Sequence, residues 1–150
     1  MEWMLLPYRR YAEFEGRSRR MEYWMFSLFT LLVMLAFGAL MIAGGFDLSA
    51  LENPDVVQAE PGPLFWVGAA GLGIFTLASL IPGIAVTVRR FHDRDMSGWW
   101  VIGFAVLGAL PYVGWIASIA NLVIMALAGT SGPNRYGPDP FDPGSADVFS

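Results

Sequence analysis

The sequence predicts an all-α integral membrane protein, a small bundle of three to four transmembrane helices that forms a single domain over residues 1–150. Its composition is 55% hydrophobic and 15% charged, whereas a soluble domain carries about a quarter charged residues. Three long apolar runs occupy residues 24–43, 64–88 and 99–128. Five of the nine arginines precede the first run and three lie between the second and the third, whereas the connection between the first two runs has none. This positive-inside pattern predicts a multi-pass protein with a cytoplasmic N-terminus.

Residues 1–23 are predicted to be a cytoplasmic or interfacial lead. Arginines and glutamates are mixed there with tryptophan, leucine and tyrosine, which is typical of a segment lying in the membrane interface. Ser18 is placed to cap a helix that carries Glu22 in its first turn. The first apolar run would be about 30 Å long as a helix and matches the hydrocarbon core, so residues 24–43 are predicted to be the first transmembrane helix.

Residues 44–63 are predicted to be a periplasmic loop. They hold four acidic residues, Asp55 among them, and no arginine. The dipeptide Asn53-Pro54 is typical of a turn. We therefore expect an acidic, non-helical connection on the outer side of the membrane.

The second transmembrane helix is predicted at residues 64–88, a length that allows the helix to tilt. Pro82 predicts a kink near its inner end. Gly68 and Gly71 have the small-residue spacing that permits close contact with another helix.

A cytoplasmic loop at residues 89–98 is expected to join the second run to the third. The third run, 99–128, would extend about 45 Å as one helix, which is too long for a straight span. A strong helix breaker around Pro111 divides it. A helical hairpin, outward over residues 99–110 and back over residues 115–128, is favoured over one kinked span. The hairpin predicts a cytoplasmic C-terminus, and the kinked span predicts an outer one.

Residues 129–150 are a polar tail rich in Pro, Gly and Asp, predicted to be irregular and disordered at least at its end. If this tail is cytoplasmic, Asp139 or Asp142 is expected to pair with the arginine clusters. The specific hypothesis is an ion pair between Arg19 and Asp139.

Four motifs, in this order, resemble the DUF805 family of small bacterial inner-membrane proteins. They are FEGRSRRMEYW from Phe14, RRFHD from Arg89, SGWW from Ser97 and GPNRYGPDP from Gly132. The resemblance extends over about residues 8–140. It implies a location in the bacterial inner (plasma) membrane, and the family carries no established activity.

The arginines just before the first span are candidates for anion binding. Arg17, Arg19 and Arg20 would lie at the depth of the lipid phosphates, which arginine binds with two parallel hydrogen bonds. A topology determinant with non-specific headgroup contact is favoured over a specific lipid or ligand site, because most clusters beside a membrane span are topological.

His92 and Asp93 are neighbours in the second arginine motif, and an enzyme would use such a pair as a base with its orienting carboxylate. No serine or cysteine nucleophile is placed near them by the sequence. A structured loop is therefore favoured over catalysis. The chain has no cysteine and a single histidine, so neither a metal site nor a cofactor is predicted.

The predicted spans contain no Asp, Glu, Lys, Arg or His, which disfavours a proton- or ion-coupled transporter. A net charge of −4 and the absence of an extended basic surface exclude nucleic acid as the expected partner. The leading hypothesis is a non-enzymatic protein that binds a partner protein, itself or anionic lipid headgroups through its cytoplasmic motifs. The predicted binding residues are Arg17, Arg19, Arg20, Arg89, Arg90, His92, Asp93, Asn134, Arg135, Tyr136 and Asp139.

Two other classes of function remain open. One is an oligomeric transport component whose pathway is lined by Thr76, Ser79, Ser118 and Asn121, the polar groups of the later spans. The other is an enzyme acting on lipid headgroups through His92 and Asp93.

Overall fold

The computed structural model of the chain describes residues 2–53 and 60–141. In these residues it has five α-helices, a short 3-10 helix and no β-strand, so the predicted helical fold class is confirmed. The predicted turn at Pro54, the acidic residues Asp55 and Asp142 and the predicted disorder at the end of the tail lie outside them.

The chain falls into two units, and the two longest helices contribute to both. One unit is Met1–Ser27 with Ile81–Ser150, and the other is Leu28–Leu80. The first holds all nine arginines, and the second holds the apolar remainder of the two long helices.

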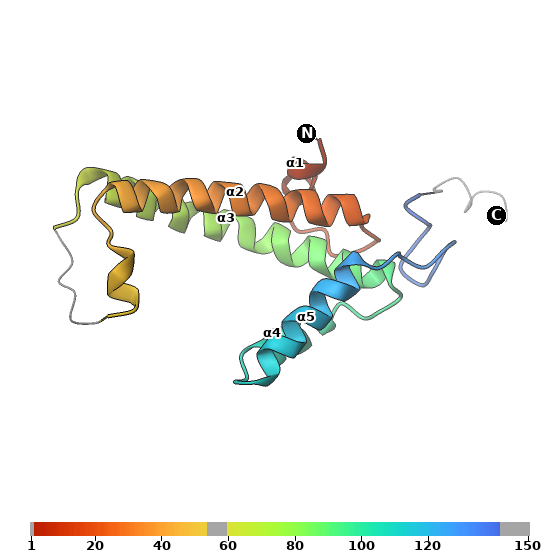
Figure 1. Ribbon diagram of the computed structural model, residues 1–150. Helices are drawn as coiled ribbons and strands as arrows, with labels where there is room; N and C mark the ends of the chain where they lie inside the picture. Colours follow the sequence, from red (N-terminus) through yellow and green to blue (C-terminus); the bar gives the residue numbers. More distant parts are fainter. Residues whose placement is uncertain (1, 54–59, 142–150) are drawn as a thin grey trace. The chain divides into compact units, whose positions relative to one another are not determined.

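Helix α2 spans Arg20–Ala43 and is long enough to cross a membrane (Figure 1). It begins four residues before the predicted start, because the buried carboxylate of Glu22 in its first turn has cationic partners and need not remain in water. Ser18 is not its N-cap, because the helix begins at Arg20 and Arg19 occupies that position. The Ser18 hydroxyl donates to Glu22 at 2.7 Å. The helix ends at two glycines, of which Gly45 has a φ of +103° that favours glycine.

Helix α3 spans Pro63–Asp93 and is the second helix long enough to cross a membrane. A proline suits the first helical position, where its missing N–H costs nothing. The helix continues through Pro82 and past residue 88, so the prediction that Arg89–Asp93 form a loop is wrong. The last turn of α3 can form while buried because its charged side chains are paired. Arg89 pairs with Glu22, and Asp93 pairs with both Arg17 and Arg90.

In the unit Leu28–Leu80 the two long helices are in close contact through small residues. A Cβ on Gly68 would meet the Phe37 carbonyl oxygen at 2.8 Å, and one on Gly71 would overlap the Phe37 ring. The Phe37 and Phe75 rings lie 6.4 Å apart. The predicted close approach at Gly68 and Gly71 is therefore confirmed. After α2, a 3-10 helix, η1 (Leu48–Leu51), precedes the residues outside the description.

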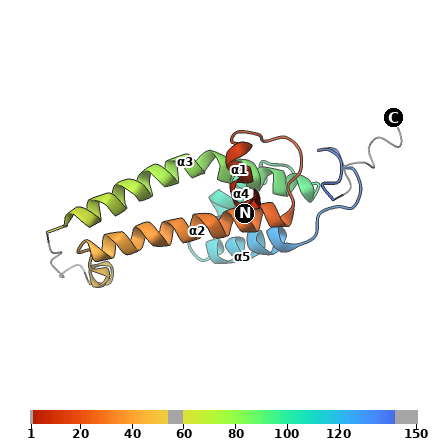
Figure 2. The same cartoon turned by 90° about the horizontal axis from the view of Figure 1, so that it is seen from above.

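The third apolar run forms two helices, α4 (Trp100–Gly108) and α5 (Val113–Ala126), which lie side by side (Figures 1 and 2). The predicted break at Pro111 is confirmed. At the turn, Tyr112 has a φ of +66°, a strained value for a residue other than glycine, and Gly114 lies against the Gly108 carbonyl.

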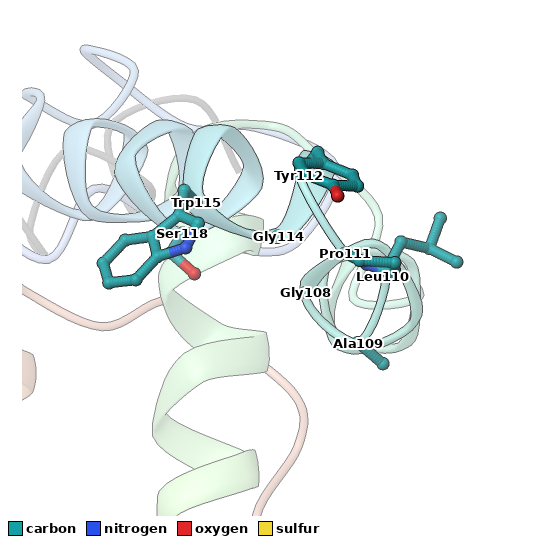
Figure 3. A pocket seen from close by; sticks show the side chains of 8 residues that line it. All are labelled: Gly108, Ala109, Leu110, Pro111, Tyr112, Gly114, Trp115 and Ser118. Atoms are coloured by element: carbon teal, nitrogen blue, oxygen red, sulfur yellow. The ribbon is translucent and has the colours of Figure 1, made fainter.

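The turn between α4 and α5 borders a cavity of about 410 Å³. In Figure 3 the side chains of Trp115 and Ser118 lie together on α5, and the Leu110 side chain points away from α5. With 9 and 14 residues, α4 and α5 are about 14 and 21 Å long, and each is shorter than a hydrocarbon core of about 30 Å.

The unit that holds both termini has an unusual core. Helix α1 (Glu2–Arg9) packs against α2 through Tyr8 and Phe26, whose rings are 5.4 Å apart. The fully buried side chains include apolar Phe91 and Met125. Six charged or hydroxyl side chains in the same unit are also buried: Arg17, Ser18, Glu22, Arg89, Arg90 and Asp93.

Candidate functional site: a buried arginine–carboxylate network

Asp93, the last residue of α3, is the first centre of the network. Its carboxylate accepts a hydrogen bond from Arg17 Nε at 2.9 Å and another from Arg90. All three side chains are at most 2% exposed. The Asp93 backbone carbonyl accepts from the Thr130 N–H at 2.8 Å. One residue thus joins the lead, the end of α3 and the start of the tail.

Arg17 connects the lead to the tail through three acceptors. Besides Asp93, its guanidinium donates to the carbonyls of Thr130 and Gly132, the latter at 2.6 Å. These acceptors lie in different directions around the planar group, an arrangement that suits the fixed fork of guanidinium donors. Arg17 is therefore a structural bridge between segments 113 to 115 positions apart.

Glu22, in the first turn of α2, is the second centre. It accepts from Arg89 at 2.8 Å and from the Ser18 hydroxyl at 2.7 Å, and the more exposed Arg10 lies 3.8 Å away. Arg89 also donates to the Glu13 carbonyl. Because Arg89 is fully buried, this pair fixes α2 against α3 and leaves no donor facing solvent.

The C-terminal end of α5 is surrounded by guanidiniums. Arg90 donates to the carbonyls of Met125 (3.1 Å) and Leu127, Arg94 to that of Ala128, and Arg20 to that of Ala126 (3.4 Å). The last carbonyls of a helix have no partner inside the helix and carry the negative end of its dipole. These contacts satisfy the carbonyls, but the helix end carries only about half a negative charge and leaves most of the positive charge of Arg20 and Arg94 uncompensated.

His92 lies beside the network but does not form a catalytic pair with Asp93. Its ring stacks on Tyr136, with centroids 3.8 Å apart, and its Nδ1 lies 3.2 Å from the Gly16 carbonyl. The Asp93 carboxylate is engaged by Arg17 and Arg90 instead. Although His92 and Asp93 are neighbours in sequence, their side chains contact different partners. The hydrogen bond by which a carboxylate orients a catalytic histidine is not formed between them.

The tail motif folds back onto α3. Asn134 Nδ2 donates to the His92 carbonyl at 2.9 Å, and the Arg135 guanidinium lies over the Tyr136 ring and 3.2 Å from Asp95. Asn134 and Gly137 form an isolated antiparallel bridge that closes the motif. Residues 134–137 thus form an ordered turn that is held against the end of α3.

Asp139 closes a second turn in the tail. It accepts from the N–H of Gly132 at 3.0 Å and from that of Phe141 at 2.9 Å. The Phe141 N–H, then the Gly132 N–H and the nearby charges of Arg17 and Arg19, lower the pKa of Asp139. Arg19 donates to the Pro140 carbonyl. The predicted Arg19–Asp139 ion pair is therefore wrong, because the carboxylate is occupied by backbone N–H groups.

The structure places all of the predicted binding residues in one unit, but in different environments. Arg17, Arg89, Arg90 and Asp93 are buried and bind one another or backbone carbonyls, whereas Arg20 is exposed. The role of Glu22 as a centre, with Arg10 and Glu13 as partners, was not predicted from the sequence. An isolated carboxylate at the edge of an apolar run, among arginines, was a usable indication of Glu22.

The polar groups proposed to line a transport pathway lie in both units. Ser118 and Asn121 border a cavity of about 260 Å³ together with Thr87, and Thr76 and Ser79 belong to the other unit. The described residues hold no cluster of three His, Cys, Asp or Glu side chains that could bind a metal ion.

An all-helical membrane protein with a buried arginine network is the class that these features define. The chain belongs to the family described as "Protein of unknown function (DUF805)", which matches residues 11–138. It is 37% identical over 144 residues to the inner membrane protein YhaH of Escherichia coli (strain K12), covering 93% of this chain and 97% of that protein. It is 34% identical over 140 residues to the inner membrane protein YhaI of the same strain, covering 93% and 96%.

A shorter stretch of 77 residues is 31% identical to undecaprenyl-diphosphatase 1 of Paramagnetospirillum magneticum, covering 49% of this chain and 29% of that protein. No solved structure matches the chain. The family and the inner-membrane relatives confirm the resemblance found in the motifs.

Proposed function

We propose that this protein is a non-enzymatic, multi-pass protein of the bacterial inner membrane that binds anionic lipid through an arginine-rich cytoplasmic face. The observation that carries the proposal is the division of the arginines into two sets. Arg17, Arg89 and Arg90 are buried and neutralised within the protein. Arg19, Arg20 and Arg94 form no ion pair within the described residues, which leaves cationic charge for an external anion.

The proposed topology follows from the network. Residues of the lead, the end of α3 and the tail are joined by buried ion pairs and hydrogen bonds, and such contacts require all three segments to lie on one side of the bilayer. The positive-inside rule assigns that side to the cytoplasm. α2 and α3 then cross the membrane, and α4 and α5, each too short to span it, form a re-entrant hairpin.

Catalysis is disfavoured by the separate partners of His92 and Asp93. The partial similarity to a diphosphatase covers too small a share of that protein to carry its reaction over. A partner protein, or a second copy of this chain, is the alternative occupant of the arginine-rich face.

The topology is tested with paired cytoplasmic and periplasmic reporters fused after Ser150. The expected result is a cytoplasmic signal, with the same side for a reporter fused at the N-terminus. A periplasmic C-terminal signal would contradict the re-entrant hairpin, and the joined polar face with it.

Lipid binding is tested by the thermal stability of delipidated protein in a neutral detergent. We expect phosphatidylglycerol to raise the melting temperature and phosphatidylcholine with the same acyl chains to have little effect. An equal response to both lipids would reject anionic lipid as the ligand. Chemical crosslinks from the exposed arginine face to another polypeptide chain would favour the alternative occupant, a partner protein or a second copy of this chain.

A further inference from the structure

One exposed arginine borders an apolar trough at the start of α2. The trough has a volume of about 490 Å³ and is lined by Arg20, Met21, Trp24, Met25, Ala126 and Phe141. Met21 and Phe141 are 56% and 63% exposed, so its walls are open to the surroundings. All of these residues belong to the unit that contains the network.

Arg20 has donors to spare. Its hydrogen bond to the Ala126 carbonyl is long, at 3.4 Å, and it forms no ion pair within the described residues. Arg90 and Arg94 donate to the next carbonyls along the chain, those of Leu127 and Ala128, so positive charge gathers at this end of α5. A phosphate accepts two parallel hydrogen bonds from one guanidinium and would complement this charge.

We propose that this trough binds one anionic glycerophospholipid, with its phosphate on Arg20 and the start of one acyl chain along Trp24, Met25 and Ala126. The inference rests on the proposed function and assigns it a site. A lipid is favoured over a soluble phosphate because the cation adjoins an apolar wall one turn inside the span, where Trp24 lies at the depth of the interfacial aromatic belt. Flexible methionine side chains suit a chain of variable shape.

The test is native mass spectrometry of the full-length, delipidated protein after addition of palmitoyl-oleoyl phosphatidylglycerol. The comparison ligands are phosphatidylcholine with the same chains and sn-glycerol 3-phosphate, which has the phosphate but no chain. For the wild type we expect one retained phosphatidylglycerol, with about fivefold weaker retention of phosphatidylcholine, the effect of about one interfacial charge.

Two variants test the two halves of the site, and one serves as a matched control. R20Q removes the cation and should weaken phosphatidylglycerol about fivefold, whereas A126F fills the trough and should weaken both lipids without changing the charge. R9Q makes the same chemical change at an exposed arginine that ends α1, outside the trough, and should bind as the wild type does. Melting temperatures within about 2 °C of the wild type establish that each variant is folded.

The outcomes separate this site from the proposed function. If phosphatidylglycerol is preferred but R20Q and A126F bind it as the wild type does, the site is wrong and the proposed function stands. If the wild type does not discriminate between the two lipids, both are wrong. If glycerol phosphate displaces phosphatidylglycerol at equal concentration, the ligand is a soluble phosphate and the assignment to a lipid fails.

Discussion

Arg17 and Asp93 are 76 positions apart and form a buried ion pair, with Nε and Oδ1 separated by 2.9 Å. Each side chain is 2% exposed. Removing two charges from water costs several kcal/mol, so such a pair adds little net stability compared with apolar residues. It does strongly disfavour every arrangement in which one partner is buried alone. The pair therefore selects the fold that brings the lead, α3 and the tail together.

Asp93→Asn should destabilise the protein by about 3–5 kcal/mol, because Arg17 and Arg90 would remain buried without a counter-charge. The measurement is thermal or denaturant unfolding in detergent. The matched control is Asp95→Asn, which breaks the exposed pair with Arg135 and should cost at most about 1 kcal/mol. Equal losses for the two variants would mean that burial of the Asp93 cluster has no energetic consequence.

Arg17→Lys should destabilise the protein by about 2 kcal/mol although the charge is kept, because a single ammonium nitrogen cannot reach acceptors on Asp93, Thr130 and Gly132 together. Arg20→Lys, at an exposed position with one long hydrogen bond, should stay within about 0.5 kcal/mol. The unfolding free energies of both variants provide the check, and an unaffected Arg17→Lys would contradict the bridging role. The chain's exclusive use of arginine fits this requirement for forked donors.

Gly129→Ala should destabilise the protein by about 1–3 kcal/mol, because a Cβ at this position would overlap the Asp93 carboxylate. Gly73→Ala is the control, since a Cβ there meets nothing within 4 Å. Alanine is the better helix former by up to about 1 kcal/mol, so Gly73→Ala should be neutral or stabilising. Opposite signs of the two changes in melting temperature are expected, and a stabilised Gly129→Ala would refute the close approach.

The backbone amides of the tail should lose protection from hydrogen exchange in acid, because the Asp139 carboxylate that binds them becomes protonated. Because the folded-state pKa of Asp139 is lowered, its contribution to stability is complete above the unfolded value of about 4. That contribution is lost as the pH falls through the lower folded value. Hydrogen exchange at the Gly132 and Phe141 amides, corrected for intrinsic rates, should become faster in this range. Asp139→Asn should remove the pH dependence, and an identical acid profile in the variant would assign it to another carboxylate.

Local sequence patterns determined the helical elements and their class. The length and hydropathy of the runs predicted α2 and α3, and the breaker around Pro111 predicted the division into α4 and α5, because backbone hydrogen bonding and proline geometry act over a few residues. The small-residue spacing at Gly68 and Gly71 likewise predicted close contact, since it depends only on the absence of a side chain.

The tertiary structure decided what the charged motifs do. Sequence alone presented Arg17, Arg89 and Asp93 as a cytoplasmic surface with a loop, and it paired Arg19 with Asp139. The structure buries the first three, extends α3 to Asp93 and directs Arg19 to a backbone carbonyl. An ion pair between residues 76 positions apart has no local pattern, because it forms only when the whole chain brings its two charges out of water together.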